Sequence, residues 1–220
     1  MSFTKPRVKI CCISSVDEAK LAIKYGASAL GLVSSMPSGP GVISDDLITE
    51  IASIIPPGVS SFLLTSKQSA DQIIEQQRKT GVNTIQICDR LVDGNYSDLK
   101  NALPGISIVQ VIHVTGKESV EEAISVSKDV NAILLDSGNQ NLKIKELGGT
   151  GRTHDWDLSK TIPESIACPM FLAGGLNPSN VKSAIEKVQP YGVDICSGVR
   201  TNGNLDEQKL KEFFAVINNF

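Results

Sequence analysis

The residues best suited to chemistry in this 220-residue chain include three clusters of small residues in its C-terminal half. They are Gly148-Gly149-Thr150-Gly151, Gly174-Gly175 and Ser197-Gly198. Consecutive glycines let the backbone come close to a ligand and direct several N–H groups at it, which suits the charge of a phosphate. Each cluster alone is also typical of a structural turn. Three clusters on one face of a fold favour a phosphate-bearing ligand.

Two kinds of reactive side chain accompany these clusters. Asp136 closes the apolar run at residues 132–135, and a carboxyl group there can act as a general acid if apolar surroundings raise its pKa. Cys11 and Cys12 lie in an earlier β-like run. Because neighbours on a strand point to opposite faces, we expect only one of the two thiols to face a site. That thiol could act as a base or nucleophile if its pKa is lowered, and otherwise serves packing.

These residues need elements that bring them together, and the chain alternates β-like runs with helical patterns in the manner of βαβ units. We predict eight strands, at residues 8–13, 29–33, 60–64, 84–87, 107–113, 132–135, 168–172 and 193–195. Helices are expected at residues 16–25, 44–54, 69–80, 97–102, 117–126, 178–188 and 206–217. A polar, glycine-rich loop of about 20 residues follows the sixth strand.

Eight strands with no composition shift and no linker favour one closed barrel over an open doubly wound sheet. We therefore predict a single (β/α)8 TIM barrel of the phosphate-binding type over residues 1–220. In such barrels the functional groups lie at the carboxyl ends of the strands and in the loops that follow. This rule selects Cys11 or Cys12, Asp136 and all three small-residue clusters as site residues.

Composition argues against several classes of function. Lys and Arg are scattered and the net charge is -3, which argues against a nucleic-acid partner. No apolar stretch reaches the roughly 18 residues of a membrane span, and the N-terminus lacks the apolar core of a signal peptide. The five cysteines have no zinc or redox spacing. We therefore expect no metal site, and reduced, mostly buried thiols in a cytoplasmic protein.

Five sets of residues lie at or near these strand ends. They are Lys9-Ile10-Cys11, Leu134-Leu135-Asp136-Ser137, Gly148-Gly149-Thr150-Gly151 with Asp155-Trp156, Leu172-Ala173-Gly174-Gly175-Leu176-Asn177-Pro178 with Asn180-Val181, and Asp194 with Ser197-Gly198-Val199. In order and spacing they resemble the phosphoribosylanthranilate isomerase family of tryptophan biosynthesis, over nearly the whole chain. The resemblance implies the barrel fold. It also implies an Amadori rearrangement that turns an N-linked phosphoribosyl amine into an amino-deoxyribulose phosphate without a cofactor.

The resemblance assigns roles to individual residues. It implies that Asp136 is the general acid that protonates the ring oxygen and that Cys11 is the general base that takes the C2 proton. Cys12 would then be an outward or packing residue. The implied phosphate-binding residues are Gly148, Gly149, Gly174, Gly175, Ser197 and Gly198. The expected partner is a small phosphosugar, and the family includes monomers and homodimers.

Several positions depart from the family pattern. The family follows its catalytic cysteine with glycine, where this chain has Cys12. Its Arg for the anthranilate carboxylate falls at Gly41, and its His after the fourth strand falls at Cys88. Its acidic residue after Ser-Gly-Val is Arg200 here, and that guanidinium could replace the missing one from another loop. The departures put the aromatic-acid half of the substrate in question.

The substrate-binding set that we expect is Lys9, Gly41, Cys88, Asp194 and Arg200. Lys9 should share the inward face of Cys11, where it would lower the thiol pKa or pair with a carboxylate. Three hypotheses stay open: a working phosphoribosylanthranilate isomerase, a diverged paralogue for another phosphosugar or phosphoribosyl amine, and a non-catalytic phosphate-binding barrel. Substitution of Cys11 or Asp136 separates an enzyme from a binder, because a site without catalysis needs neither.

Overall fold

The computed structural model describes residues 5–220 of the chain. Within them, eight parallel strands pair in chain order and close into a barrel, because β1 bonds to both β2 and β8. The strands are β1 (Arg7–Ile10), β2 (Ala29–Val33), β3 (Ser60–Thr65), β4 (Thr84–Ile87), β5 (Ser107–His113), β6 (Ala132–Asp136), β7 (Met170–Leu172) and β8 (Gly192–Ile195). The predicted (β/α)8 fold class is confirmed.

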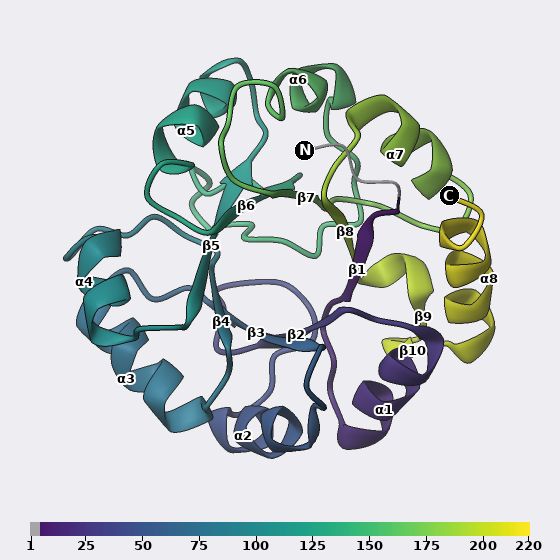
Figure 1. The fold of residues 1–220 in the computed structure, drawn as a ribbon, viewed down its shortest axis with the longest axis horizontal. Coiled ribbons are helices and arrows are strands. Elements are labelled where there is room, and N and C mark those ends of the chain that lie inside the picture. The colour runs from purple at the N-terminus through teal and green to yellow at the C-terminus, as the bar shows by residue number, and fades with distance from the viewer. Residues whose placement is uncertain (1–4) are drawn as a thin grey trace.

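Eight α-helices of the described residues surround the strands as an outer ring (Figure 1). They are α1 (Val16–Tyr25), α2 (Asp45–Ile54), α3 (Ala70–Thr80), α4 (Tyr96–Ala102), α5 (Glu118–Val126), α6 (Trp156–Thr161), α7 (Val181–Val188) and α8 (Glu207–Ile217). Ser44 caps α2 as predicted, since its side chain accepts the N–H of Leu47. Gly26 and Gly81 end α1 and α3 in the left-handed conformation that glycine tolerates. None of the helices in residues 5–220 is both long and apolar enough to cross a membrane.

Three segments differ from the sequence prediction. The loop after β6 contains the short helix α6, capped by the Asp155 side chain, which accepts the N–H of Asp157. After β8, a turn of 3-10 helix (η1, Ser197–Val199) leads into a hairpin of β9 (Arg200–Thr201) and β10 (Asn204–Leu205). These elements are too short to show a periodic pattern. The first strand ends at Ile10 rather than at residue 13, because the backbone turns at Cys12.

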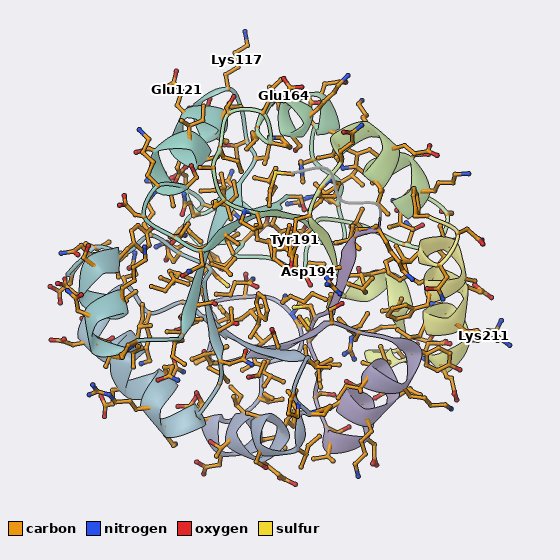
Figure 2. All side chains as sticks on the ribbon, in the orientation of Figure 1. Lys117, Glu121, Glu164, Tyr191, Asp194 and Lys211 are labelled. Atoms are coloured by element: carbon orange, nitrogen blue, oxygen red, sulfur yellow. The ribbon has the colours of Figure 1, made fainter. Side chains whose placement is uncertain are left out.

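Alternation along the strands divides the core into two layers. In β1, Val8 and Ile10 pack outward against the helices, whereas Lys9 lies inside the barrel and is fully buried. Figure 2 shows the same division, with Asp194 and Tyr191 inside the ring of strands and the labelled Lys and Glu side chains outside it. The barrel interior therefore holds polar groups below the carboxyl ends of the strands.

Candidate active site

The carboxyl end of the barrel holds a cavity of about 690 Å³, counted with its open mouth. The residues predicted from the sequence that line it are Cys11, Cys88, Asp136, Gly148, Gly149, Gly174, Gly175, Asp194 and Ser197. The structure thus brings most of the predicted residues to one cavity. The remaining four, Lys9, Gly41, Gly198 and Arg200, lie outside its lining.

The glycine clusters line the cavity with a left-handed backbone. The φ angle is 67° at Gly149, 84° at Gly174 and 60° at Gly175, values that residues with a side chain rarely adopt. The N–H groups of these three glycines make no hydrogen bond to other residues in the range 5–220. Successive free N–H groups in such a backbone form a concave site for an anion. The wall on this side therefore suits a phosphate.

The three clusters also contact one another. A Cβ on Gly175 would lie 2.7 Å from the carbonyl carbon of Arg152, so only glycine lets the loop after β7 lie against the loop after β6. A Cβ on Gly151 would lie 3.7 Å from Oγ of Ser197. Gly198 faces away from the cavity, and a Cβ there would lie 2.0 Å from a carbonyl oxygen of the loop after β7. Gly198 therefore holds the loops together and does not line the cavity.

Asp136 stands at the end of β6, beside the first glycine cluster. Its Oδ1 accepts the N–H of Ser137 at 2.7 Å. Its Oδ2 lies 2.9 Å from the point that a Cβ on Gly148 would occupy. The hydrogen bond fixes the carboxyl group, and the second oxygen is left beside the anion-accepting wall.

Cys11 lies just above a buried ion pair. Nζ of Lys9 donates to Oδ2 of Asp194 at 2.8 Å, with the lysine fully buried. Burial alone would lower the pKa of Lys9, but the Asp194 carboxylate outweighs burial and raises it, so the lysine stays charged. The neighbouring Cys12 thiol and the charge of Lys9 together lower the pKa of Cys11 against the effect of burial. The shift is in the direction that a cysteine acting as a base requires.

Gly31, in the middle of β2, makes this approach possible. A Cβ on Gly31 would lie 2.9 Å from Sγ of Cys11 and 3.0 Å from Nζ of Lys9. Any side chain there would push the cation or the thiol away. A glycine inside a strand is the sequence signal for such close approach, and Gly31 was not among the predicted site residues.

The predicted outward orientation of Cys12 is wrong, because both neighbouring cysteines line the cavity. The strand ends at Ile10, and Cys12 has a left-handed φ of 61° that turns its side chain back toward the mouth. Strict alternation applies only within a strand, so it does not apply to Cys12. The Cys12 sulfur lies 2.7 Å from Sγ of Cys196, in the loop after β8.

The guanidinium of Arg200 does not reach the cavity. Its Nη1 and Nη2 donate to the two carboxylate oxygens of Glu18 in α1, each at 2.9 Å. Nη2 also donates to the backbone carbonyl oxygens of Cys11 and Cys12. Burial would lower the pKa of Arg200, but Glu18 outweighs it and raises it. Arg200 therefore fixes the loop after β1 from outside the cavity and supplies no cation to it.

Gly41 also lies behind the lining. Its φ is 78°, and a Cβ on it would lie 2.5 Å from Cβ of Cys12. The segment before it, Gly39-Pro40, does line the cavity. Gly41 therefore supports Cys12 and offers no group to a ligand.

Two buried acceptors in the cavity lining have no partner within residues 5–220. They are Oε1 of Gln86, in β4, and Oδ1 of Asp194, in β8. Cys88, which directly follows β4, is almost fully buried, and burial raises the pKa of its thiol. It therefore lines the cavity as an uncharged side chain. A buried acceptor without a donor is costly, so a ligand that brings hydroxyl groups would satisfy both.

The charge of the cavity is also distinctive. Its lining holds the carboxyl groups of Asp136 and Asp194 and, within residues 5–220, no Lys, Arg or His side chain. In the same part of the chain, no group of three or more His, Cys, Asp or Glu side chains is arranged to hold a metal ion.

Comparison with known proteins shows the family of the chain. The sequence profile described as N-(5'phosphoribosyl)anthranilate (PRA) isomerase matches residues 8–216. The chain belongs to the phosphoribosylanthranilate isomerase family. N-(5'-phosphoribosyl)anthranilate isomerase of Methanocella arvoryzae is 32% identical over 212 residues, which cover 96% of this chain and 97% of that protein. Isomerase 2 of Methanosarcina mazei is 34% identical over 209 residues, 94% of this chain and 92% of that protein.

Solved structures of the phosphoribosylanthranilate isomerase family have the same fold. The Thermotoga maritima enzyme superposes with a TM-score of 0.81 at 27% identity, over 98% of this chain and all of that one (100%). A family member in complex with reduced 1-(o-carboxyphenylamino)-1-deoxyribulose 5-phosphate gives a TM-score of 0.79 at 26% identity, with 98% and 100% coverage. Both likenesses cover the whole barrel.

Within the phosphoribosylanthranilate isomerase family, this chain departs at positions that now have physical descriptions. Cys12 stands where the resemblance implied glycine, and its left-handed φ of 61° explains why glycine suits that position. Arg200 stands where the resemblance implied an acidic residue, and its guanidinium donates a hydrogen bond to the Glu18 carboxylate in α1. Glu18 thus provides the opposite charge that a buried arginine at this position needs.

Gln86 and Cys196 line the cavity but were not among the site residues predicted from the sequence. Thr150, which belongs to the first predicted cluster, also lines it. The Oγ atoms of Ser137 and Thr150 lie 2.7 Å apart and join the two ends of the loop after β6. Gln86 lies in β4, two residues before Cys88 at the end of that strand, so period-two alternation could have placed it in the cavity. Cys196 directly precedes the third cluster, but its contact with Cys12 has no sequence signal.

Proposed function

We propose that this chain catalyses the Amadori rearrangement of N-(5'-phosphoribosyl)anthranilate, with Asp136 as the general acid and Cys11 as the general base. One observation carries the proposal: a thiol whose pKa is lowered and a fixed carboxyl group share one cavity with an anion-accepting wall of glycines. The family of the chain supports the same reaction.

The chemistry follows from the two groups. Protonation of the ring oxygen by Asp136 assists cleavage of the bond between that oxygen and C1, and the amine nitrogen then forms a C1 iminium ion. Cys11 removes the C2 proton, and the electron pair of that C–H bond neutralises the iminium nitrogen and forms an enol. Cys11 then returns its proton to C1, and the C2 hydroxyl gives its proton to the Asp136 carboxylate, so that the C2 ketone forms and both catalytic groups regain their starting states. No atom is gained or lost, so acid and base suffice.

The backbone N–H groups of the glycine clusters are proposed to hold the phosphate. Gly149, Gly174 and Gly175 offer free N–H groups from two neighbouring loops, and Ser197 adds its own from the third. The unpartnered oxygens of Gln86 and Asp194 would accept hydrogen bonds from the ribose hydroxyls. The sugar phosphate would thus be held along its length, with C1 and C2 between the acid and the base.

The carboxylate of the anthranilate group would meet no cationic side chain in the described lining. Hydrogen bonds from neutral groups favour a substrate with a carboxylate over one without it less strongly than a bidentate guanidinium does. We therefore expect this site to accept N-phosphoribosyl arylamines without a carboxylate nearly as well as the anthranilate compound.

The decisive experiment follows the loss of fluorescence of N-(5'-phosphoribosyl)anthranilate with the wild type, Cys11→Ala and Asp136→Asn. Removing a general acid or base lowers kcat by about 10²- to 10⁴-fold. Cys168→Ser is the matched control, because this thiol lies before β7 and outside the cavity. Absence of turnover by folded wild type would refute the function. Full activity of Cys11→Ala would instead remove Cys11 as the base.

We also propose a cytoplasmic location, since a reactive thiol base keeps its function where thiols stay reduced. Residues 1–220 are proposed to act as one domain, either as a monomer or as a homodimer. Light scattering of the purified protein distinguishes the two states.

A further inference from the structure

Thiols are concentrated at the cavity to a degree that the proposed reaction does not need. Four of the five cysteines of the chain line it: Cys11, Cys12, Cys88 and Cys196. Only Cys11 is an acid or base in the proposed chemistry, and Cys88 is a buried, uncharged part of the wall. Cys12 and Cys196 require a separate explanation.

Two of these sulfurs are in direct contact. Sγ of Cys196 lies 2.7 Å from Sγ of Cys12, although the residues are 184 positions apart in the chain. A covalent S–S bond is about 2.05 Å long, so a small movement would join them. Cys11 and Cys12 cannot pair in the same way. Consecutive Cα atoms are about 3.8 Å apart, below the range of about 4.4 to 6.8 Å that a disulfide spans.

The surrounding structure holds the pair together. Arg200 donates to the carbonyl oxygen of Cys12, and the lack of a side chain on Gly41 lets the chain pack against Cβ of Cys12. Sγ of Cys12 also lies 3.7 Å from the carbonyl oxygen of Pro40. The left-handed backbone at Cys12 is thus fixed from two sides, and it directs the sulfur at Cys196.

We propose that Cys12 and Cys196 form a reversible disulfide when the protein meets a peroxide, and that this bond lowers the activity of the site. Cys196 is the more exposed of the two and reacts first. Its thiolate attacks one peroxide oxygen, an S–O bond forms, the O–O bond breaks, and hydroxide leaves and is protonated to water. The Cys12 sulfur then attacks the sulfenic acid, the S–S bond forms, the S–O bond breaks, and hydroxide leaves with the Cys12 proton as a second water. The two sulfurs lose two electrons in total, and the peroxide gains them.

The bond acts on the base by removing a neighbouring thiol. Cys11 and Cys12 line the same cavity, the Cys12 thiol lowers the pKa of Cys11, and in the disulfide Cys12 no longer has a thiol. The other charged or titratable groups that act on Cys11 or its neighbours are Lys9, Asp194, Cys88 and Asp136, which the disulfide leaves unchanged. Oxidation therefore raises the Cys11 pKa, and kcat/KM near neutral pH falls several-fold. This loss rests on the proposed function, whereas the disulfide itself does not.

The test treats the reduced protein with one equivalent of hydrogen peroxide, blocks free thiols by alkylation and digests it with trypsin. The expected product joins the peptide of residues 10–20 to that of residues 188–200, with two hydrogens lost. The first peptide contains both Cys11 and Cys12, so the same link is expected in Cys11→Ser. Dithiothreitol should restore both free thiols and the activity. The crosslink should also raise the thermal unfolding temperature, because it closes a loop of most of the chain.

Two variants sharpen the test. Cys12→Gly should fold, since glycine suits the left-handed backbone, and Cys196→Ser is nearly isosteric. Both should lose the link and the response to peroxide, whereas Cys168→Ser should keep both. Oxidation only of Cys11, a link to Cys88, or no loss of two hydrogens would overturn the proposal. A link that forms without any change in turnover would overturn its effect on activity and leave the disulfide standing.

Discussion

Replacing Lys9 with Met tests whether the buried cation tunes the Cys11 base. A Cβ built on Gly31 would lie 2.9 Å from Sγ of Cys11 and 3.0 Å from Nζ of Lys9. The sulfur and the nitrogen are therefore no more than about 6 Å apart. At that separation and an effective dielectric constant of about 20, two unit charges attract by roughly 3 kcal/mol. This energy corresponds to about two pH units in a thiol pKa. Because activity requires the thiolate, Lys9→Met should move the acid limb of the kcat/KM profile upward by about one to two pH units.

Asp194 provides the control for this change. Lys9→Met leaves a buried carboxylate without its partner, which costs about 3 to 5 kcal/mol of stability. The double variant Lys9→Met/Asp194→Asn removes both charges and should recover much of that loss. Since the Asp194 carboxylate raises the pKa of Cys11, the double variant should show a smaller upward displacement than Lys9→Met alone. The pH of the acid limb should therefore be lowest in the wild type, higher in the double variant and highest in Lys9→Met.

The assay combines two measurements. The pH dependence of kcat/KM reports the free enzyme, and the pH dependence of Cys11 alkylation, followed by mass spectrometry in a Cys12→Gly background, reports the thiol without substrate. Both should move together. If the acid limb of folded Lys9→Met stays within about 0.3 pH units of the wild type, the attraction is far weaker than roughly 3 kcal/mol and the reasoning fails.

Three further predictions follow from the site. Arg200→Met should lower the free energy of unfolding by about 3 kcal/mol, because it leaves Glu18 without its partner. Since the folded pKa of Glu18 lies below its ordinary 4.5, this difference should persist above that pH and shrink as the pH falls through the folded value; a constant difference in chemical denaturation down to strong acid would contradict it. Gly175→Ala should raise KM more than it lowers kcat, because a Cβ separates the two phosphate loops, and unchanged inhibition by inorganic phosphate would speak against that wall as the phosphate site. Met36→Arg places a guanidinium in the lining and should lower KM for the anthranilate substrate by about tenfold. An equal effect on an N-phosphoribosyl arylamine without a carboxylate would show that the carboxylate is not involved.

Much of the fold could be predicted because the signals are repeated. Eight β-like runs alternate with amphipathic helices, and the residues at their ends follow the barrel rule. That rule brought Asp136 and the glycine clusters to one cavity without any knowledge of side-chain positions. The short helix α6 and the hairpin of β9 and β10 were not predicted, because elements of two to six residues have no usable periodicity.

The site residues that sequence could not place are those whose neighbours come from distant loops. Arg200 follows a functional cluster, but its guanidinium turns to Glu18, and only the folded chain brings these two residues together. Gly41 was expected at the position of the family's substrate-binding Arg, yet in the structure it packs against Cys12. In both cases the residue type was informative, and its direction depended on a partner far away in the sequence.

Position 12 shows how such contacts decide which residue serves best. A left-handed backbone costs a residue with a Cβ about 1 to 2 kcal/mol. Glycine would recover this energy but lose about 0.5 to 1 kcal/mol through its greater freedom in the unfolded chain. The contact of the Cys12 thiol with Cys196 stabilises the wild type by about 1 kcal/mol, which glycine would lose. Cys12→Gly should therefore change the free energy of unfolding by less than about 1 kcal/mol, while the acid limb of kcat/KM moves upward because the Cys12 thiol that lowers the pKa of Cys11 is gone. A loss of stability above about 2 kcal/mol with an unmoved acid limb would make Cys12 a packing residue and remove it from the chemistry.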